Sequence, residues 1–242
     1  MSTDLQAVPA RTDFYTVVHK GLRKRLFETV VLAGTTNYAD SDERVRLAAT
    51  VAGVVTVLRE HAKHEDEFLH PIIAEVLPEV ARTLASEHEE HNRALDEVER
   101  GFEVAVAETT GAAAHRAYRV LARFTAHFLV HLEEEEAGQG QVWELAGEAR
   151  FAAGMTAFKR SRTLDQSLAG WALMLPAMNP AERAAMFRDL RTGAPEAVFT
   201  AAWRLAERVL DRGACDALKA SLEATGLVPP MHSDAFLSRM AP

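Results

Sequence analysis

The hydrophobic and polar positions along the first 150 residues repeat with helical spacing. Apolar side chains recur three and four positions apart, and alternation with a period of two is not sustained anywhere. Asn-Gly and Asp-Gly pairs, the strongest short signals for a β-hairpin, do not occur in the sequence. The pattern therefore predicts an all-α protein.

The first two predicted helices have clear end signals. Helix one runs from about residue 13 to residue 33, and Gly34 is expected to close it. The second helix begins after Asp40, whose short carboxylate is suited to cap it, and Pro78 is expected to end it. Both segments carry an unbroken apolar stripe along one face, which predicts that this face is buried.

The third and fourth predicted helices follow in the same rhythm. The third starts near Glu79, and the fourth starts after Gly111 and weakens around Gly138 and Gly140. Only short polar turns separate the four segments. This organisation predicts an up-down-up-down four-helix bundle over residues 13–147.

The chain changes character after about residue 150. Short helices are expected there, and a capping Asn179 stands before Pro180 at the start of one of them. Their predicted bounds are 165–175, 181–190, 196–210 and 214–224. These segments contain no histidine. Residues 151–228 are therefore expected to be a helical C-terminal extension that packs on the bundle or mediates association, for example in a homodimer.

Composition narrows the class of protein. The 242 residues are 48% hydrophobic and 26% charged, which is typical of a folded soluble domain. A net charge of -8 with scattered basic residues argues against a nucleic-acid or anionic-membrane partner. No apolar run approaches the roughly 20 residues of a membrane span. A single cysteine, Cys215, and a polar start without a signal-peptide pattern favour a cytoplasmic location.

The histidines are concentrated in the predicted bundle. Nine of the ten lie between positions 19 and 131, and at least five fall on the apolar stripes, where burial of an unpaired polar group is costly. The pairs His61/Glu65 and His131/Glu135 each place an imidazole and a carboxylate one turn apart on one helix face. The other stripe histidines are His19, His88 and His91.

A metal would satisfy these buried groups. Mixed imidazole and carboxylate ligation suits iron, with manganese as the second choice, whereas a structural zinc site would more often use cysteines. His19 and His88 give the first and third helices one inward ligand each. Four imidazoles and two carboxylates are enough for a dinuclear centre.

These motifs resemble a known family. His19, the run from His61 to Glu65 that leads to Pro71, the Glu87-His88 pair, and the run from His131 to Glu135 resemble the hemerythrin-like, or HHE cation-binding, family over about residues 13–147. The resemblance implies two non-haem irons bridged by carboxylates. It assigns the ligand roles to His19, His61, Glu65, His88, His131 and Glu135.

One position departs from the hemerythrin pattern. Hemerythrin has a second histidine four residues after the first on helix three, but Asn92 stands there and His91 precedes it. Either His91 or a solvent molecule is expected to fill the seventh ligand position. His127 and His64 are secondary candidates, each as a direct ligand or as a hydrogen-bond partner of a ligand.

Several neighbouring residues are predicted to take no part in the site. Only Glu135 of its acidic run is in register with the stripe, and Cys215 is expected to be a small buried apolar residue. His232, in the Pro-rich C-terminal segment, has no assigned role. The residues predicted to face solvent are His70, His115, Glu133, Glu134 and Glu136.

Three functions are compatible with such a centre. The resemblance favours binding of, or response to, dioxygen, peroxide or nitric oxide. The alternative is a di-iron oxidase or oxygenase that acts on a small organic substrate, and iron handling is the third. An enzyme would need a pocket, for which Trp171, Met174, Met178 and Trp203 are candidate wall residues. The sequence assigns no catalytic residue.

Overall fold

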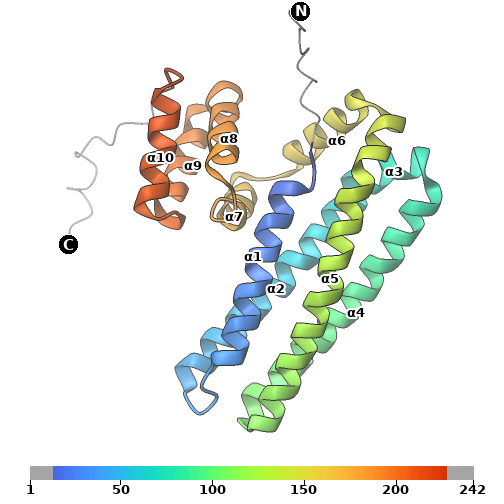
Figure 1. Cartoon of the computed structure of the whole chain (residues 1–242), viewed down its shortest axis with the longest axis vertical. Coiled ribbons are helices and arrows are strands. Elements are labelled where there is room, and N and C mark those ends of the chain that lie inside the picture. Colours follow the sequence, from blue (N-terminus) through green and yellow to red (C-terminus); the bar gives the residue numbers. More distant parts are fainter. Residues whose placement is uncertain (1–12, 228–242) are drawn as a thin grey trace, which may run out of the picture. The chain divides into compact units, whose positions relative to one another are not determined.

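The computed structural model describes residues 13–227, and within this range it contains ten helices and no strand (Figure 1). The predicted all-α class is confirmed. The chain divides into two compact units, of which the first ends at Ser161 and the second begins at Arg162. The predicted boundary near residue 150 thus falls inside the first unit.

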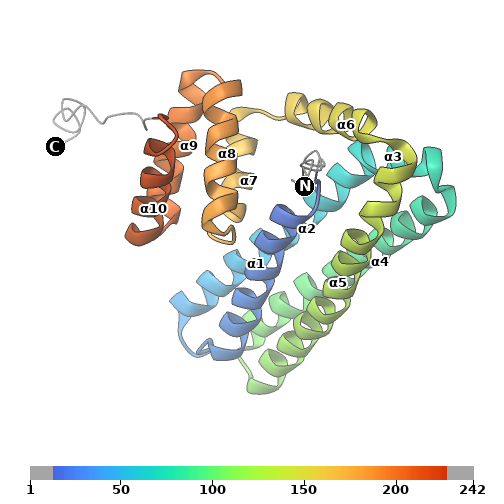
Figure 2. The same cartoon turned by 45° about the horizontal axis from the view of Figure 1, so that its top comes forward.

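Four long helices form the body of the first unit. They are α1 (Thr16–Thr35), α2 (Ser41–Phe68), α4 (Pro78–Glu108) and α5 (Gly111–Ala146). Each contacts two others, in the ring order α1, α2, α4, α5 and back to α1. Figures 1 and 2 show the four lying side by side, with short connections that reverse the chain direction. The predicted four-helix bundle is confirmed.

The apolar stripes lie in the core of the bundle and continue into polar residues. On α2 the buried stripe passes from Val54 and Leu58 to His61 and Glu65. On α5 it passes in the same way from Phe128 to His131 and Glu135. Burial of each large apolar side chain contributes roughly 1.5–3 kcal/mol. The hydrocarbon part of each stripe therefore holds the helix in the register that carries its histidine and glutamate inward.

The helix starts follow their capping residues. Asp40 accepts hydrogen bonds from two backbone N–H groups in the first turn of α2, at 2.8 and 3.0 Å, as predicted. Asp13 lies outside α1, and its carboxylate accepts from the backbone N–H groups of Tyr15 and Thr16. Helix α1 therefore begins three residues later than predicted, and it ends at Thr35 beyond Gly34.

The prediction of one continuous helix up to Pro78 is wrong. Helix α2 stops at Phe68, and a separate helix α3 (His70–Val76) begins after Leu69. Pro71 explains the break, because it has no N–H to continue the hydrogen bonds of α2 but fits the first turn of α3. Pro78 likewise stands in the first turn of α4.

The predicted weakening of the last bundle helix is also wrong. Helix α5 continues through Gly138 and Gly140 to Ala146 and ends at Gly147, whose φ of +82° a residue with a side chain rarely adopts. Each interior glycine costs a helix about 1 kcal/mol relative to alanine. The packing of the long apolar stripe on α5 compensates for this cost.

Helix α6 (Glu148–Ser161) was not predicted. It contacts α2, α3 and α5, and its Phe151 is buried in a cluster with Leu69 and Ile73. Gly154 allows this close approach, since a Cβ there would lie 2.7 Å from the side chain of Ile72. The helix is thus part of the first unit.

The second unit contains the four short helices α7 (Leu164–Met174), α8 (Pro180–Gly193), α9 (Glu196–Val209) and α10 (Arg212–Glu223). Asn179 forms a capping box with Glu182 at the start of α8. The ring of Phe187 contacts Phe199 and Trp203 edge-on in the core.

Of the four predicted pocket-wall residues, Met178 and Trp203 are buried in the core of the second unit, and Trp171 and Met174 are half-buried. Cys215 is half-buried rather than fully buried. Its Sγ lies 3.6 Å from the backbone oxygen of Ala206, which allows a weak S–H hydrogen bond.

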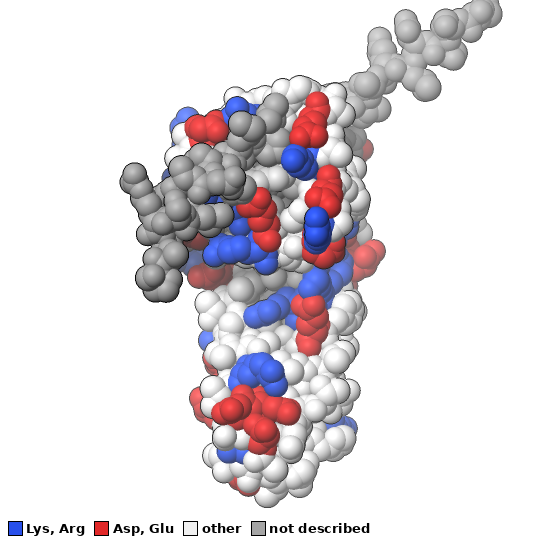
Figure 3. All heavy atoms as spheres, turned by 90° about the vertical axis from the view of Figure 1, so that its left-hand side faces the viewer, with Lys and Arg blue, Asp and Glu red and all other residues white. Residues whose placement is uncertain are grey.

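Charges of both signs are mixed on one face of the molecule. On the face shown in Figure 3, the lysines and arginines of the described residues lie next to aspartates and glutamates, without a broad area of one sign.

None of the described helices combines the length and apolar character of a membrane span. His232 lies outside the described residues.

Candidate metal centre

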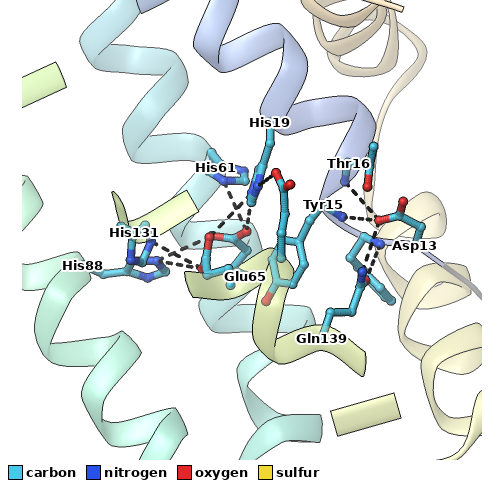
Figure 4. A network of polar contacts seen from close by, with 12 residues as sticks. Asp13, Tyr15, Thr16, His19, His61, Glu65, His88, His131 and Gln139 are labelled. Atoms are coloured by element: carbon cyan, nitrogen blue, oxygen red, sulfur yellow. Dashed lines mark hydrogen bonds and ion pairs between the residues drawn. The ribbon is translucent and has the colours of Figure 1, made fainter. Parts of the chain in front are cut away.

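Six side chains from four helices converge inside the bundle. Figure 4 shows His19, His61, Glu65, His88 and His131 pointing toward one another. They are His19 of α1, His61 and Glu65 of α2, His88 of α4, and His131 and Glu135 of α5. All six are buried, with exposed fractions of 8% or less. The structure thus brings together all six residues to which the resemblance assigns ligand roles.

The carboxylate of Glu65 lies between two pairs of histidines. Its Oε1 is 3.2 Å from Nε2 of His61 and 3.7 Å from Nε2 of His19. Its Oε2 is 3.5 Å from Nε2 of His88. The two oxygens of one side chain therefore face opposite sides of the centre.

Glu135 has the same arrangement. Its Oε2 is 3.5 Å from Nε2 of His19, and its Oε1 is 3.3 Å from Nε2 of His131 and 3.9 Å from Nε2 of His88. Two groups of ligand atoms result, one with His19 and His61 and the other with His88 and His131, and both groups contain Glu65 and Glu135. Shared carboxylates of this kind can bridge two cations.

The inward atoms of the cluster have no hydrogen-bond partner. Among the described residues, eight of the twelve buried side-chain nitrogen and oxygen atoms without a hydrogen-bond partner belong to this cluster: Nε2 of His19, His61, His88 and His131, and both carboxylate oxygens of Glu65 and Glu135. Buried polar groups are normally paired, and leaving one unpaired costs about 1–3 kcal/mol. Eight such atoms in two adjoining groups fit bound metal, which would satisfy all of them.

The outward nitrogens of three of these histidines do have partners. Nδ1 of His19 donates to Glu136 at 2.9 Å, Nδ1 of His88 donates to Asp66 at 2.9 Å, and Nδ1 of His131 donates to Glu87 at 2.8 Å. A proton on Nδ1 leaves the lone pair on Nε2, and it is this lone pair that binds a metal. The carboxylates therefore fix the tautomer that is competent for ligation.

Burial keeps the imidazoles neutral. It lowers the pKa of His19 to about 4, although the hydrogen bond to Glu136 opposes this shift. Burial and the neighbouring His88 lower the pKa of His131 to about 3. The pKa of His61 is also far below its usual value because of burial and the neighbouring histidines. All three are therefore in the form that binds metal at neutral pH.

The two carboxylates show the opposite effect. Burial raises the pKa of Glu65 well above its usual value, and the negative charge of Glu135 raises it further. The pKa of Glu135 is raised by burial and by Glu87. Two carboxylates held this close together are costly to ionise unless a cation lies between them. A cation bound between the two carboxylates would relieve this cost.

The three secondary candidates lie in different surroundings, and none belongs to either group of ligand atoms. His91 is half-buried, and its ring centroid is 4.7 Å from that of His131 and 5.2 Å from that of Phe128. His64 is half-buried against the ring of Phe158 on α6. His127 is exposed.

Two residues predicted to face solvent are instead partners of the site. His70 is buried, stacks on His88, and donates from Nδ1 to Asp66 at 2.9 Å. It faces inward because the break after α2 changes the direction of the chain. Glu136 is half-buried because it accepts from both His19 and Arg23 across the interface between α5 and α1.

The remaining predictions for solvent-facing residues agree with the structure. His115, Glu133 and Glu134 are exposed. The roles of Asp66 and Glu87 as histidine partners were not predicted. Glu87 directly precedes His88 in the quoted motif, but its contact with His131 crosses from α4 to α5 and is not visible in the sequence of one helix.

Tyr15 is a further residue of the site that sequence reasoning missed. It is 2% exposed, and its ring centroid lies 4.9 Å from that of His19. Burial and the nearby carboxylates of Glu135 and Glu65 raise its pKa well above the usual value, so the phenol keeps its proton. The site therefore contains a buried proton donor beside the ligands.

A cavity of about 270 Å³ adjoins the centre. Tyr15 and Glu135 form part of its wall, and the rest comes from α4, α5 and the segments around α3 and α6. The metal centre is thus not sealed on all sides by packed side chains.

A helical bundle with converging histidines and two shared carboxylates defines a class of protein that binds metal between its helices. Comparison with known families agrees. The model of the hemerythrin HHE cation binding domain matches residues 11–139, which is more than half of the chain. The chain therefore belongs to the hemerythrin HHE cation-binding family, as the sequence motifs predicted. No match was found among curated proteins or solved structures.

Proposed function

We propose that the protein holds two non-haem iron ions and binds, or responds to, dioxygen or a related small oxidant such as peroxide or nitric oxide. The observation that carries this proposal is the set of eight buried, unpartnered donor atoms in two groups that share Glu65 and Glu135. Family membership supports the metal, and imidazole with carboxylate ligation favours iron, with manganese as the second choice.

The ligand count leaves room for a small molecule. Each group supplies two imidazoles and one oxygen from each of two carboxylates, so four protein ligands would hold each ion. Iron in such sites commonly takes five or six ligands, and the remaining positions would be open. A reduced iron pair, when bound, supplies the electrons for oxygen chemistry.

The surrounding residues prepare the site for this chemistry. Asp66, Glu87 and Glu136 orient three of the imidazoles and increase their basicity. Tyr15 holds a proton within the buried site. The buried apolar stripes of the four helices limit contact with bulk water to the side on which the cavity opens, which protects a reduced metal from side reactions.

The test is metal analysis and spectroscopy on anaerobically purified protein. We expect about two irons per chain and a visible absorption that appears with O2 and is lost on reduction. The variant His61→Ala should lose this absorption, whereas His115→Ala, at an exposed histidine on α5, should keep it. No stoichiometric iron, or equal behaviour of the two variants, would overturn the proposal.

The cavity favours a second function, in which the centre oxidises a small organic substrate. Oxygen consumption distinguishes the two functions. A binding or sensing protein takes up O2 once per centre, while an oxidase or oxygenase consumes O2 continuously when substrate and reductant are supplied.

A further inference from the structure

The cavity beside the metal centre is lined mainly by apolar side chains. Leu69, Ile73, Leu84, Val142 and Phe151 form its wall, and Tyr15 lies where it meets the metal ligands. All six are buried and belong to one hydrophobic cluster. Such a wall favours a hydrocarbon or aromatic ligand over water.

Gly138 helps to leave this space open. It lies on the cavity wall in the C-terminal part of α5, and a Cβ built there would meet no atom within 4 Å. A glycine at this place weakens the helix by about 1 kcal/mol relative to alanine. The absence of a side chain is therefore not needed to avoid a clash, and its structural effect is to keep volume free.

The volume sets the size of the ligand. An apolar cavity of about 150 Å³ accommodates benzene. The cavity here is about 270 Å³, which is enough for one ring with a short substituent. The exposed side chains of Val80 and Thr83 on α4 belong to its lining, so a ligand can enter from solvent.

The charges on the wall are of one sign. Glu79, Glu87 and Glu134 lie around the cavity, and no lysine or arginine is among the lining residues. Arg82 pairs with Glu79 from outside the lining. The cavity therefore disfavours a negatively charged ligand.

We propose that this cavity binds a small aromatic or aliphatic molecule that is neutral or positively charged, next to the metal centre. This inference rests on the proposed function only for the chemistry that would follow. Binding itself depends on the cavity. If the centre acts as an oxidase or oxygenase, molecules of this kind are its substrate class.

The test uses three probes that share one ring: benzyl alcohol, benzylamine and benzenesulfonate, whose anionic group is a weak ligand for iron. Relaxation of their ring protons is measured by NMR during titration with iron-loaded protein, and iron content is measured on the same samples. We expect the alcohol and the amine to bind with a Kd of about 1 mM or tighter, as suits eight heavy atoms. Benzenesulfonate should bind at least about tenfold more weakly.

Two glycines on α5 give a matched pair of variants. Gly138→Phe should fill the cavity and weaken benzyl alcohol binding at least about tenfold. Gly140→Phe is the control, because Gly140 has equally open space at its Cβ but does not line the cavity. Equal effects of the two variants would overturn the inference.

A second pair avoids any loss of folding. Val80→Trp at the exposed lining should weaken binding, and Val104→Trp, at an exposed valine farther along α4, should not. Iron-loaded protein that binds none of the probes, or prefers benzenesulfonate, would refute the cavity inference and leave the iron proposal intact. A chain that binds benzyl alcohol but holds no iron would refute the iron proposal alone.

Discussion

The two units of the chain are both helical, but their cores differ in chemistry. All nine buried polar or charged residues among positions 13–227 lie in the first unit. The second unit is held together by aliphatic side chains and by the rings of Phe187, Phe199 and Trp203. A stable helical core can therefore be built in this chain without any buried charge.

This contrast shows what the polar core of the first unit is for. Burying a carboxylate or an imidazole without a partner costs several kcal/mol, and the second unit avoids that cost altogether. The first unit accepts it at Glu65, Glu135 and four histidines that point at each other. Such an arrangement is explained by a ligand that restores the lost interactions, and a metal does so.

The largest expected effect is the loss of a shared carboxylate. Glu135→Ala removes an oxygen from both groups of ligand atoms, so both irons should be lost together. Metal analysis after iron loading should give close to zero irons per chain, against two for the parent. Glu134→Ala, at the exposed neighbour, should keep both. Retention of one iron by Glu135→Ala would show that the two positions are independent.

A core substitution in the second unit should have the opposite effect: it should destabilise that unit without loss of iron. Phe199→Ala removes a fully buried ring and should cost about 3–5 kcal/mol of the free energy of unfolding of that unit. Iron content and the visible spectrum should stay at the parental level. Denaturant unfolding followed by tryptophan fluorescence and by the iron absorption would detect the difference. A parallel loss of iron would mean that the units are energetically coupled.

The histidine partners should have a smaller effect than the ligands. Asp66 accepts hydrogen bonds from both His88 and His70, so Asp66→Ala should weaken iron binding about 10–100-fold without abolishing it. Competition with a chelator of known affinity would measure the change. Glu67→Ala, at an exposed neighbour on α2, should bind iron like the parent. An unchanged affinity in Asp66→Ala would show that packing alone orients His88.

The smallest expected effect is that of pH on stabilisation by iron. The raised pKa values of Glu65 and Glu135 mean that the folded, metal-free chain holds protons that the unfolded chain releases above its usual pKa. The stability of the metal-free chain therefore falls as pH rises from the usual pKa of a glutamate toward the raised pKa values of Glu65 and Glu135 in the folded chain. Histidines with folded pKa values of about 3 to 4 do not add to this above pH 6.5, because they are neutral in both states.

Iron displaces those carboxyl protons, so its binding should strengthen as pH rises. Between pH 6.5 and 8, the increase that iron causes in the midpoint of thermal unfolding of the first unit should become larger as pH rises. The corresponding gain in iron affinity is up to about tenfold per pH unit for each proton released. The second unit, which holds no buried ionisable group among its described residues, should not respond. A flat profile would show that the carboxylates are ionised without metal.

Much of this structure follows from periodicity. The stripes predicted the four bundle helices, and the same register predicted which histidines and glutamates face inward. His70 was misplaced because a helical wheel assumes one continuous helix, whereas Pro71 divides α2 from α3. Glu136 was misplaced because its burial depends on Arg23 and His19 of another helix. Contacts between helices are not contained in the period of either one.

The cavity was equally out of reach from sequence. Gly138 reads as a signal of helix weakness, but its effect depends on what neighbouring helices leave empty around it. The candidate pocket residues were instead sought in the C-terminal segment, at Trp171, Met174, Met178 and Trp203. The volume of a cavity depends on how several helices pack together, and it can be measured only in the three-dimensional structure.

The origin of the two shared carboxylates has a mechanical consequence. Glu65 comes from α2 and Glu135 from α5, which lie diagonally in the bundle and each pack mainly against α1 and α4. A cation held by both side chains is a cross-brace between helices that share little direct contact. Fluctuations in the distance between α2 and α5 would then depend on whether metal is bound. Loss of a single ion would allow both helices to move more along their whole length.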